Sequence, residues 1–131
     1  GVAVQPRSRS KELLEFEIAF YEQLLKAHPD FVDALTALGE AYTRQGLYEK
    51  GLTVDQQLTR LKAQDPIAWY NLACSYTLLK RAEEALHALR RAFELGYDDP
   101  AYLLKDPDLA DLRASPALRE LLQAFASHRT S

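Results

Sequence analysis

A pattern of large and small apolar residues recurs in this chain at an offset of 34 positions. In the later copy, Trp69, Leu72 and Tyr76 follow at spacings of three and four residues, with the small Ala73 between them. This spacing places the side chains on one face of an α-helix, where they would form a buried stripe. The positions 34 residues earlier hold Leu35, Leu38, Gly39 and Tyr42. The repeated stripe predicts two equivalent helices, each packed closely against a neighbour at its small residue.

The match continues into a second helix of each copy. Gly51 and Ala85 are the small residues there, and Leu52 and Leu86 follow them. A glycine inside a helix costs about 1 kcal/mol relative to alanine, so Gly51 predicts a close approach to Gly39 in the preceding helix. A unit of about 34 residues that repeats itself is typical of a helix-turn-helix repeat. Each copy is therefore expected to form one antiparallel helical hairpin.

Between about Leu13 and Tyr97, the chain resembles the tetratricopeptide repeat family. The resemblance depends on the residues above, on their common offset, and on Pro29 at the position that closes such a repeat. It implies an all-α fold, in which antiparallel helix-turn-helix repeats stack as a short right-handed superhelix of about seven helices. The run from Asp106 to Pro116 resembles the closing segment of many bacterial repeat proteins, which covers the last apolar face of a stacked array.

Helical spacing and turn residues predict the domain organisation. We expect a flexible tail at residues 1–9 and a single repeat domain at residues 10–131. The domain is divided into a partial first repeat (10–29), a second repeat (30–64), a third repeat (65–97) and a C-terminal cap (98–131). The expected helices span 11–27, 31–44, 48–63, 66–79 and 82–95, with further helices starting at Pro100 and Pro116. Ser10, Asp30 and Asp65 are the expected N-caps, because their side chains accept hydrogen bonds from the first helical turn.

The helix expected at residues 11–27 has no partner helix before it. Its Ile18 lies 34 residues before Leu52, so the helix corresponds to the second helix of a repeat whose first helix is missing. Phe16, Phe20 and Tyr21 are therefore available to fill the surface of a partner. This feature suggests an alternative function, in which the chain self-associates or serves as a structural module of a larger protein.

The family resemblance implies a non-catalytic scaffold that binds a peptide or protein segment on its concave face. In such arrays the first helix of each repeat lines that face. The residues expected to contact a partner are those on these helices that lie off the buried stripe, together with one residue of the cap. They are Thr36, Glu40, Arg44, Tyr70, Asn71, Thr77 and Lys105.

Asn71 and Tyr70 each allow two interpretations. In chaperone-binding members of the family, an asparagine at this position bonds the backbone of a bound peptide, while Asn71 could equally be a solvated residue of the helix surface. Those members also carry a lysine and an asparagine one repeat earlier, where this chain has Thr36 and Glu40. Glu40 would repel a terminal carboxylate, so we do not expect a chaperone tail as partner. Tyr70 is either an aromatic anchor in a groove or a cover over a helix junction with its hydroxyl in water.

Composition and motifs exclude several other function classes. The formal net charge is -3, whereas nucleic-acid-binding domains are usually basic. Cys74 is the only cysteine, expected to be a half-buried small apolar residue, and the three histidines are scattered, so we expect no metal site. The sequence contains no nucleophile–base pair and no glycine-rich phosphate loop. We therefore expect no enzyme and no cofactor.

Hydropathy gives the remaining expectations. No apolar run approaches the roughly 18 residues that a transmembrane helix needs, and no signal peptide is visible. We expect a soluble, cytoplasmic protein that does not insert into a membrane. Its partner would be a protein or peptide rather than a nucleic acid, and the chain itself would be a monomer or a weak homodimer.

Overall fold

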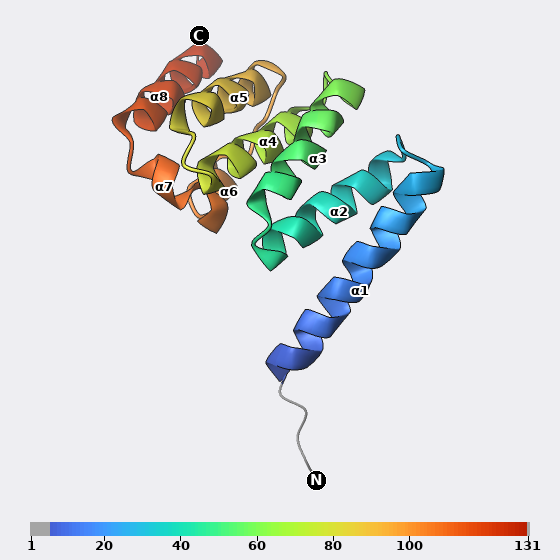
Figure 1. Cartoon of the computed structure of the whole chain (residues 1–131). Helices are drawn as coiled ribbons and strands as arrows, with labels where there is room; N and C mark the ends of the chain where they lie inside the picture. The colour runs from blue at the N-terminus through green and yellow to red at the C-terminus, as the bar shows by residue number, and fades with distance from the viewer. Residues whose placement is uncertain (1–5, 131) are drawn as a thin grey trace. The chain divides into compact units, whose positions relative to one another are not determined.

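The computed structural model describes the backbone of residues 6–130 and the side chains of residues 10–127. This part of the chain contains eight α-helices and one 3-10 helix, against about seven helices expected, and the predicted all-α fold is confirmed (Figure 1). The chain folds into two compact units, Gly1–Leu61 and Lys62–Ser131. Their boundary lies close to the predicted boundary between the second and third repeats; the division into repeats and a cap stays a prediction.

The first unit consists of three helices in sequence. They are α1 (Pro6–Ala27), α2 (Val32–Gln45) and α3 (Tyr48–Leu61). Helix α2 packs against both α1 and α3 (Figure 1). Gly46 connects α2 to α3 with a positive φ of 83°, a conformation that glycine adopts without steric cost. Its amide donates to the carbonyl of Thr43 at 3.0 Å, which closes the end of α2.

The predicted apolar stripe forms the core of the first unit. The buried residues of this core are Leu35, Leu38 and Tyr42 of the stripe, together with Ile18, Ala41, Val54 and Leu58. A Cβ added to Gly51 would lie 3.3 Å from Oγ1 of Thr43 and 3.8 Å from the carbonyl oxygen of Gly39. The predicted close approach of α3 to α2 at these two glycines is therefore confirmed.

The start of the first helix and two N-caps of the first unit differ from the prediction. Helix α1 begins at Pro6, so residues 6–9 are helical and do not belong to a tail, while residues 1–5 lie outside the described residues. Proline fits the first turn of a helix because its missing amide has no partner there, and Ser10 lies inside α1. Helix α2 has Phe31 as its N-cap and no capping side chain. The carboxylate of Asp30, the expected cap, accepts instead from the amide of Gln57 at 3.5 Å.

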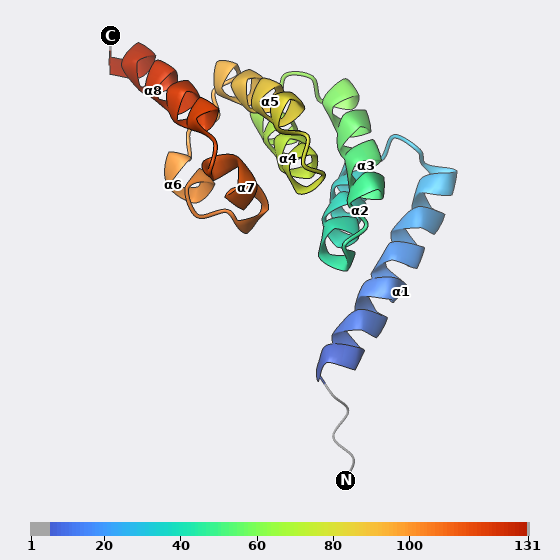
Figure 2. The ribbon, with the colours of Figure 1, turned by 60° about the vertical axis from the view of Figure 1, so that its left-hand side comes forward.

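The second unit begins with the hairpin of α4 (Pro66–Leu78) and α5 (Ala82–Glu94), which pack side by side (Figure 2). The predicted N-cap at Asp65 is confirmed, because its carboxylate accepts from the amide of Ile67 at 2.9 Å. Leu72 and Ala73 of the stripe are buried, whereas the larger Trp69 and Tyr76 are half-buried. The two hairpins, α2–α3 and α4–α5, thus arise from equivalent residues.

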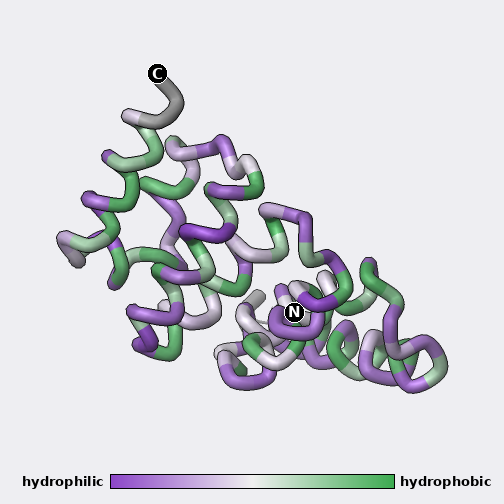
Figure 3. Tube along the Cα trace, turned by 90° about the horizontal axis from the view of Figure 1, so that it is seen from above, coloured by the Kyte–Doolittle hydropathy of each residue, from purple (hydrophilic) through white to green (hydrophobic). Residues whose placement is uncertain are grey.

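Three short helices and a final helix of 15 residues follow the second hairpin in the described part of the chain. They are α6 (Pro100–Leu103), the 3-10 helix η1 (Pro107–Leu109), α7 (Ala110–Arg113) and α8 (Pro116–Thr130). The predicted starts at Pro100 and Pro116 are confirmed. Leu103, Leu109 and Leu112 are fully buried, which anchors these short turns. Hydrophobic and hydrophilic residues alternate along the helical trace, as expected for amphipathic helices (Figure 3).

Candidate partner-binding surfaces

The α2 face, defined here as Thr36, Glu40 and Arg44, presents charged groups to solvent. Glu40 is exposed, and Thr36 is half-buried with its hydroxyl donating to the carbonyl of Val32 at 2.9 Å. The guanidinium of Arg44 donates to the carboxylate of Glu17 on α1 at 3.0 Å, with 59% and 43% of the two side chains exposed. The α2 face therefore offers one carboxylate and one paired guanidinium to a partner.

The α4 face, defined here as Tyr70, Asn71 and Cys74, is mostly covered. Tyr70 is 4% exposed, and its hydroxyl donates to Oδ2 of Asp106 at 2.6 Å. Its ring stacks on that of Tyr97 with the centroids 4.5 Å apart. The interpretation of Tyr70 as an exposed groove anchor is therefore wrong. Tyr70 does lie at a helix junction, but a buried carboxylate takes the place of the expected water.

The chain's own residues 106–113, here named the covering segment, lie on α4. They form η1 and α7, both of which pack against α4. The guanidinium of Arg113 donates to the carbonyls of Leu103 at 2.9 Å and of Asp106 at 2.6 Å, which ties the two ends of this turn together. An ion pair between Lys80, just after α4, and Asp111 adds a contact at the surface. The α4 face is thus occupied by a segment from later in the chain.

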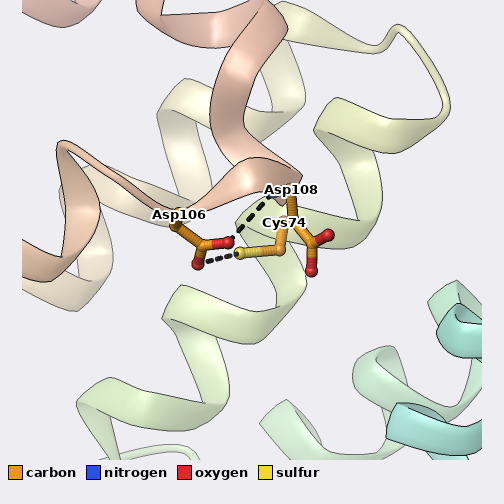
Figure 4. Close-up of side chains that lie close together, drawn as sticks. All are labelled: Cys74, Asp106 and Asp108. Carbon is orange, nitrogen blue, oxygen red and sulfur yellow. Dashed lines mark hydrogen bonds between the residues drawn. The ribbon is translucent and has the colours of Figure 1, made fainter.

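Three side chains with possible metal-ligating atoms meet under the covering segment. Cys74 of α4 lies with Asp106, the N-cap of η1, and with Asp108 of η1, so that their ligand atoms are within 4.8 Å of one another (Figure 4). Sequence spacing gave no signal of this cluster, because Cys74 is far from the two aspartates along the chain. The atoms of Asp106 already serve the fold: Oδ1 accepts from the amide of Asp108 at 3.0 Å, and Oδ2 accepts from Tyr70. The cluster is therefore a helix cap in contact with α4, and the absence of a metal site stays a prediction.

Burial raises the pKa of groups in and beside this cluster. Burial, and then the hydrogen bond to Asp106, raise the pKa of the Tyr70 phenol well above its usual range. Burial also raises the pKa of Tyr97. For the carboxyl of Asp108, burial and then the charge of Asp106 raise the pKa. In each case the protonated, neutral form is favoured, as expected where charged groups lose contact with water.

The remaining predicted residues are distributed unevenly. Thr77 is 3% exposed and its hydroxyl donates to the carbonyl of Ala73 at 2.8 Å, so it cannot contact a partner as predicted. Asn71 is half-buried on α4, and Lys105 is exposed just after α6. Cys74 is buried rather than half-buried. Exposed candidates thus remain mainly on the α2 face, where Glu40 and Arg44 lie.

Comparisons with known proteins identify related sequences and a related structure. Family models described as tetratricopeptide repeat match residues 20–53 and 67–96. The chain is 33% identical over 90 residues to a chloroplastic protein of Arabidopsis thaliana, a match that covers 66% of this chain and spans 27% of that relative. The crystal structure of MamA superimposes with a TM-score of 0.69 and 24% identity, covering 97% of this chain and 75% of that one. At this identity, the likeness to MamA shows a shared fold.

A helix that crosses a bilayer must be both long and apolar. Within the residues that the structure describes, none of the helices meets both conditions.

Proposed function

Because this chain is a tetratricopeptide repeat protein, we propose that it is a non-catalytic scaffold that binds a segment of another protein on its α2 face. Tetratricopeptide repeats generally mediate protein–protein interaction. Binding would use an extended or helical segment laid along the first helix of a repeat. The absence of catalysis is part of the same proposal.

One observation carries this proposal: the α4 face already holds a segment of polypeptide. The covering segment lies on α4 through a buried hydrogen bond from Tyr70 to Asp106. The first helix of a repeat in this protein therefore has the shape and the polar groups needed to hold a short turn of chain. At the equivalent position on α2, Glu40 is exposed and available to a segment from another protein.

The charges of the α2 face indicate what the partner segment would carry. Glu40 favours a cationic or hydrogen-bond-donating group and disfavours a terminal carboxylate. Arg44 is shared with Glu17 on α1, so an acidic side chain of the partner would compete with that ion pair. The partner would therefore present donors near Glu40 and an acceptor toward the end of α2.

The proposal can be tested with charge-reversed variants of two exposed glutamates. Glu40→Lys changes the α2 face, whereas Glu49→Lys changes the first turn of α3 and serves as the matched control. A partner captured from the source organism, once identified, should bind Glu40→Lys at least about tenfold more weakly than it binds Glu49→Lys. Equal affinity for the two variants would remove the partner site from α2.

A second candidate function, self-association, is favoured by the outer side of α1. Leu13, Phe16 and Phe20 are 58%, 70% and 55% exposed. They share one helical face because their spacing is three and four residues. Tyr21, which the sequence also made available, packs against the core of the first unit instead. A run of exposed large apolar side chains on one face is a common sign of an interface.

Sedimentation velocity over a range of concentrations separates the two candidates. Self-association predicts a weak dimer that Phe16→Asp abolishes and that Leu104→Asp, at a leucine after α6 that is 57% exposed, leaves intact. A strict monomer at high concentration would reject this candidate and leave the scaffold. The cytoplasmic location and the lack of nucleic-acid binding stay predictions, which cell fractionation and a mobility-shift titration would test.

A further inference from the structure

The second unit contains a groove whose lining residues differ from those of the faces described above. It is bounded by α5, the connection from α5 to α6, and α8, and its volume is about 530 Å³. Pockets of roughly 300–1,000 Å³ are the size that holds a ligand or a group of side chains. The groove therefore has room for more than one side chain of a partner.

The floor of this groove is aromatic. The rings of Phe93 on α5 and Phe125 on α8 are 5.1 Å apart between centroids, and Phe93 meets the edge of Tyr97 at 5.9 Å. Tyr97 is buried, while Phe93, Leu122 and Phe125 are half-buried, so they present apolar surface to the groove. An aromatic or branched aliphatic side chain entering here would lose water from both partners, which favours binding.

The rim of the groove is acidic. Glu94 and Asp98 line it and are exposed, and among the described lining residues there is neither lysine nor arginine. Glu94 shares a long ion pair of 3.6 Å with Arg91. Asp99, next along the chain, directs its carboxylate to the amide of Tyr102 at 3.0 Å. The open end of the groove therefore favours a cation beside the apolar contact.

We propose that this α5–α8 groove binds a short segment of a partner protein that carries an aromatic or aliphatic anchor next to lysine or arginine. The anchor packs on Phe93 and Phe125, and the cation lies near Glu94 and Asp98. This surface belongs to the second unit and shares no residue with the α2 face of the first unit. Apolar burial supplies the affinity, and the acidic rim selects basic over acidic segments.

The direct test uses blocked synthetic peptides and isotope-labelled whole chain. The probe has a central Phe-Leu pair flanked by lysines; one comparison peptide replaces the lysines with glutamate and another replaces Phe-Leu with alanine. NMR shifts should move at Gly96, whose backbone lines the groove, and calorimetry should show at least about tenfold weaker binding of both comparison peptides. Equal binding of the lysine and glutamate peptides would overturn the proposal.

Matched alanine variants on α8 test the location. Ala126 lines the groove and Ala124 does not, although both are exposed. Ala126→Trp should fill the groove and abolish binding of the lysine peptide, and Ala124→Trp should leave it unchanged, with circular dichroism showing that both variants are folded. Binding that survives in Ala126→Trp would overturn the proposal. So would a concentration-dependent dimer that Ala126→Trp alone disrupts, because the occupant would then be a second copy of the chain.

The rim carboxylates are tested separately. The double variant Glu94→Gln with Asp98→Asn should weaken binding of the lysine peptide by about threefold to tenfold at low salt, and less at high salt. Glu120→Gln, at an exposed position of α8 that is not among the lining residues, is the control. An unchanged affinity in the double variant would contradict the proposal that the partner segment carries a basic residue beside the anchor.

Discussion

The α2 and α4 faces occupy equivalent positions in two repeats, yet their described side chains differ in burial. Thr36 and Glu40 of α2 correspond, 34 residues later, to Tyr70 and Cys74 of α4. Thr36 is half-buried and Glu40 is exposed, whereas Tyr70 and Cys74 are both buried under the covering segment. The comparison teaches that the repeat determines where a backbone lies, while the side chains off the buried stripe determine what that backbone can hold.

The side chains of the α4 face suit the segment that covers it. The hydroxyl of Tyr70 donates to Oδ2 of the buried Asp106 carboxylate at 2.6 Å, and the small thiol of Cys74 donates to the same oxygen at 3.8 Å. The equivalent of Cys74 on α2 is Glu40, whose carboxylate would repel Asp106 if it stood at the same place. The difference between the two faces is therefore set by one acidic residue and one aromatic residue.

Exchanging the residues at these equivalent positions is expected to have the largest effect. Cys74→Glu would place a buried carboxylate against Asp106, and an unpaired buried charge costs about 3–5 kcal/mol. Glu40→Cys, at the exposed position of α2, should change stability by less than about 0.5 kcal/mol. Urea unfolding followed by the fluorescence of Trp69, the chain's single tryptophan, reports on the second unit and measures the loss in Cys74→Glu. Hydrogen exchange of α2 amides reports on the first unit and measures the change in Glu40→Cys. Similar losses in both variants would mean that the two faces do not differ in burial.

Removing one hydroxyl from the α4 face should have the next largest effect. Tyr70→Phe keeps the ring that stacks on Tyr97 but leaves the buried Asp106 carboxylate without this donor, which costs about 1–3 kcal/mol. Tyr102→Phe is the matched control, because its side chain is 45% exposed. The free energy of unfolding, again from Trp69 fluorescence, should fall in Tyr70→Phe alone. If Tyr102→Phe is equally destabilised, the buried hydrogen bond does not explain the difference.

The Tyr70 hydroxyl should make the free energy of unfolding depend on pH in the alkaline range. Burial raises the pKa of Tyr70 in the folded state, whereas an unfolded tyrosine keeps its ordinary pKa of about 10. Below pH 10 both states hold the proton, so the contribution is fully present. Above about pH 10 only the unfolded state releases it, and stability falls by up to about 1.4 kcal/mol per pH unit for each such group. Tyr70→Phe should show a shallower decline than the unmodified chain in urea unfolding between roughly pH 8 and 11.

Tyr42 of the first unit provides the comparison within this pH experiment. Its phenol donates to Glu22 of α1 at 2.5 Å, and burial followed by that hydrogen bond raises its pKa as well. Tyr42→Phe should therefore reduce the alkaline decline of the first unit, followed by hydrogen exchange of α2 amides, but not that of Trp69 fluorescence. A Trp69 profile altered by Tyr42→Phe and unaltered by Tyr70→Phe would contradict the assignment.

The repeat framework could be predicted from the sequence because it depends on residues close together in the chain. The spacing of Leu35, Leu38 and Tyr42 defines a buried face of α2, and the small residues Gly39 and Gly51 define where α3 approaches. Asp65 and Pro66 likewise act on their own helix. These local residue patterns recur in each repeat, so finding the pattern a second time supports the helices assigned from the first.

The burial of the α4 face could not be predicted, because the segment that covers it comes after the repeats and is not part of the repeated pattern. Asp106 follows the last repeat, and nothing in the spacing of α4 indicates that its carboxylate bonds to Tyr70. The residues of α4 outside the buried stripe are expected at the surface, as in a repeat array whose concave face is open. The prediction of Asp30 as the N-cap of α2 is wrong for a related reason, because the Asp30 carboxylate accepts from Gln57 of α3 rather than from its own helix.

The smallest expected effect concerns the ion pair that ends the α2 face. The side chains of Arg44 and Glu17 are 59% and 43% exposed, and pairs near the surface contribute about 0–1 kcal/mol because water and salt screen them. A double-mutant cycle with Arg44→Gln and Glu17→Gln, followed by hydrogen exchange of α2 amides, should give a coupling in that range that shrinks with added salt. A coupling above about 1 kcal/mol would mean that Arg44 is structural. A small coupling means that Arg44 can leave Glu17 and pair with a group of the partner protein at little cost in stability. Loss of binding in Arg44→Gln would then report a contact with the partner protein rather than damage to the fold.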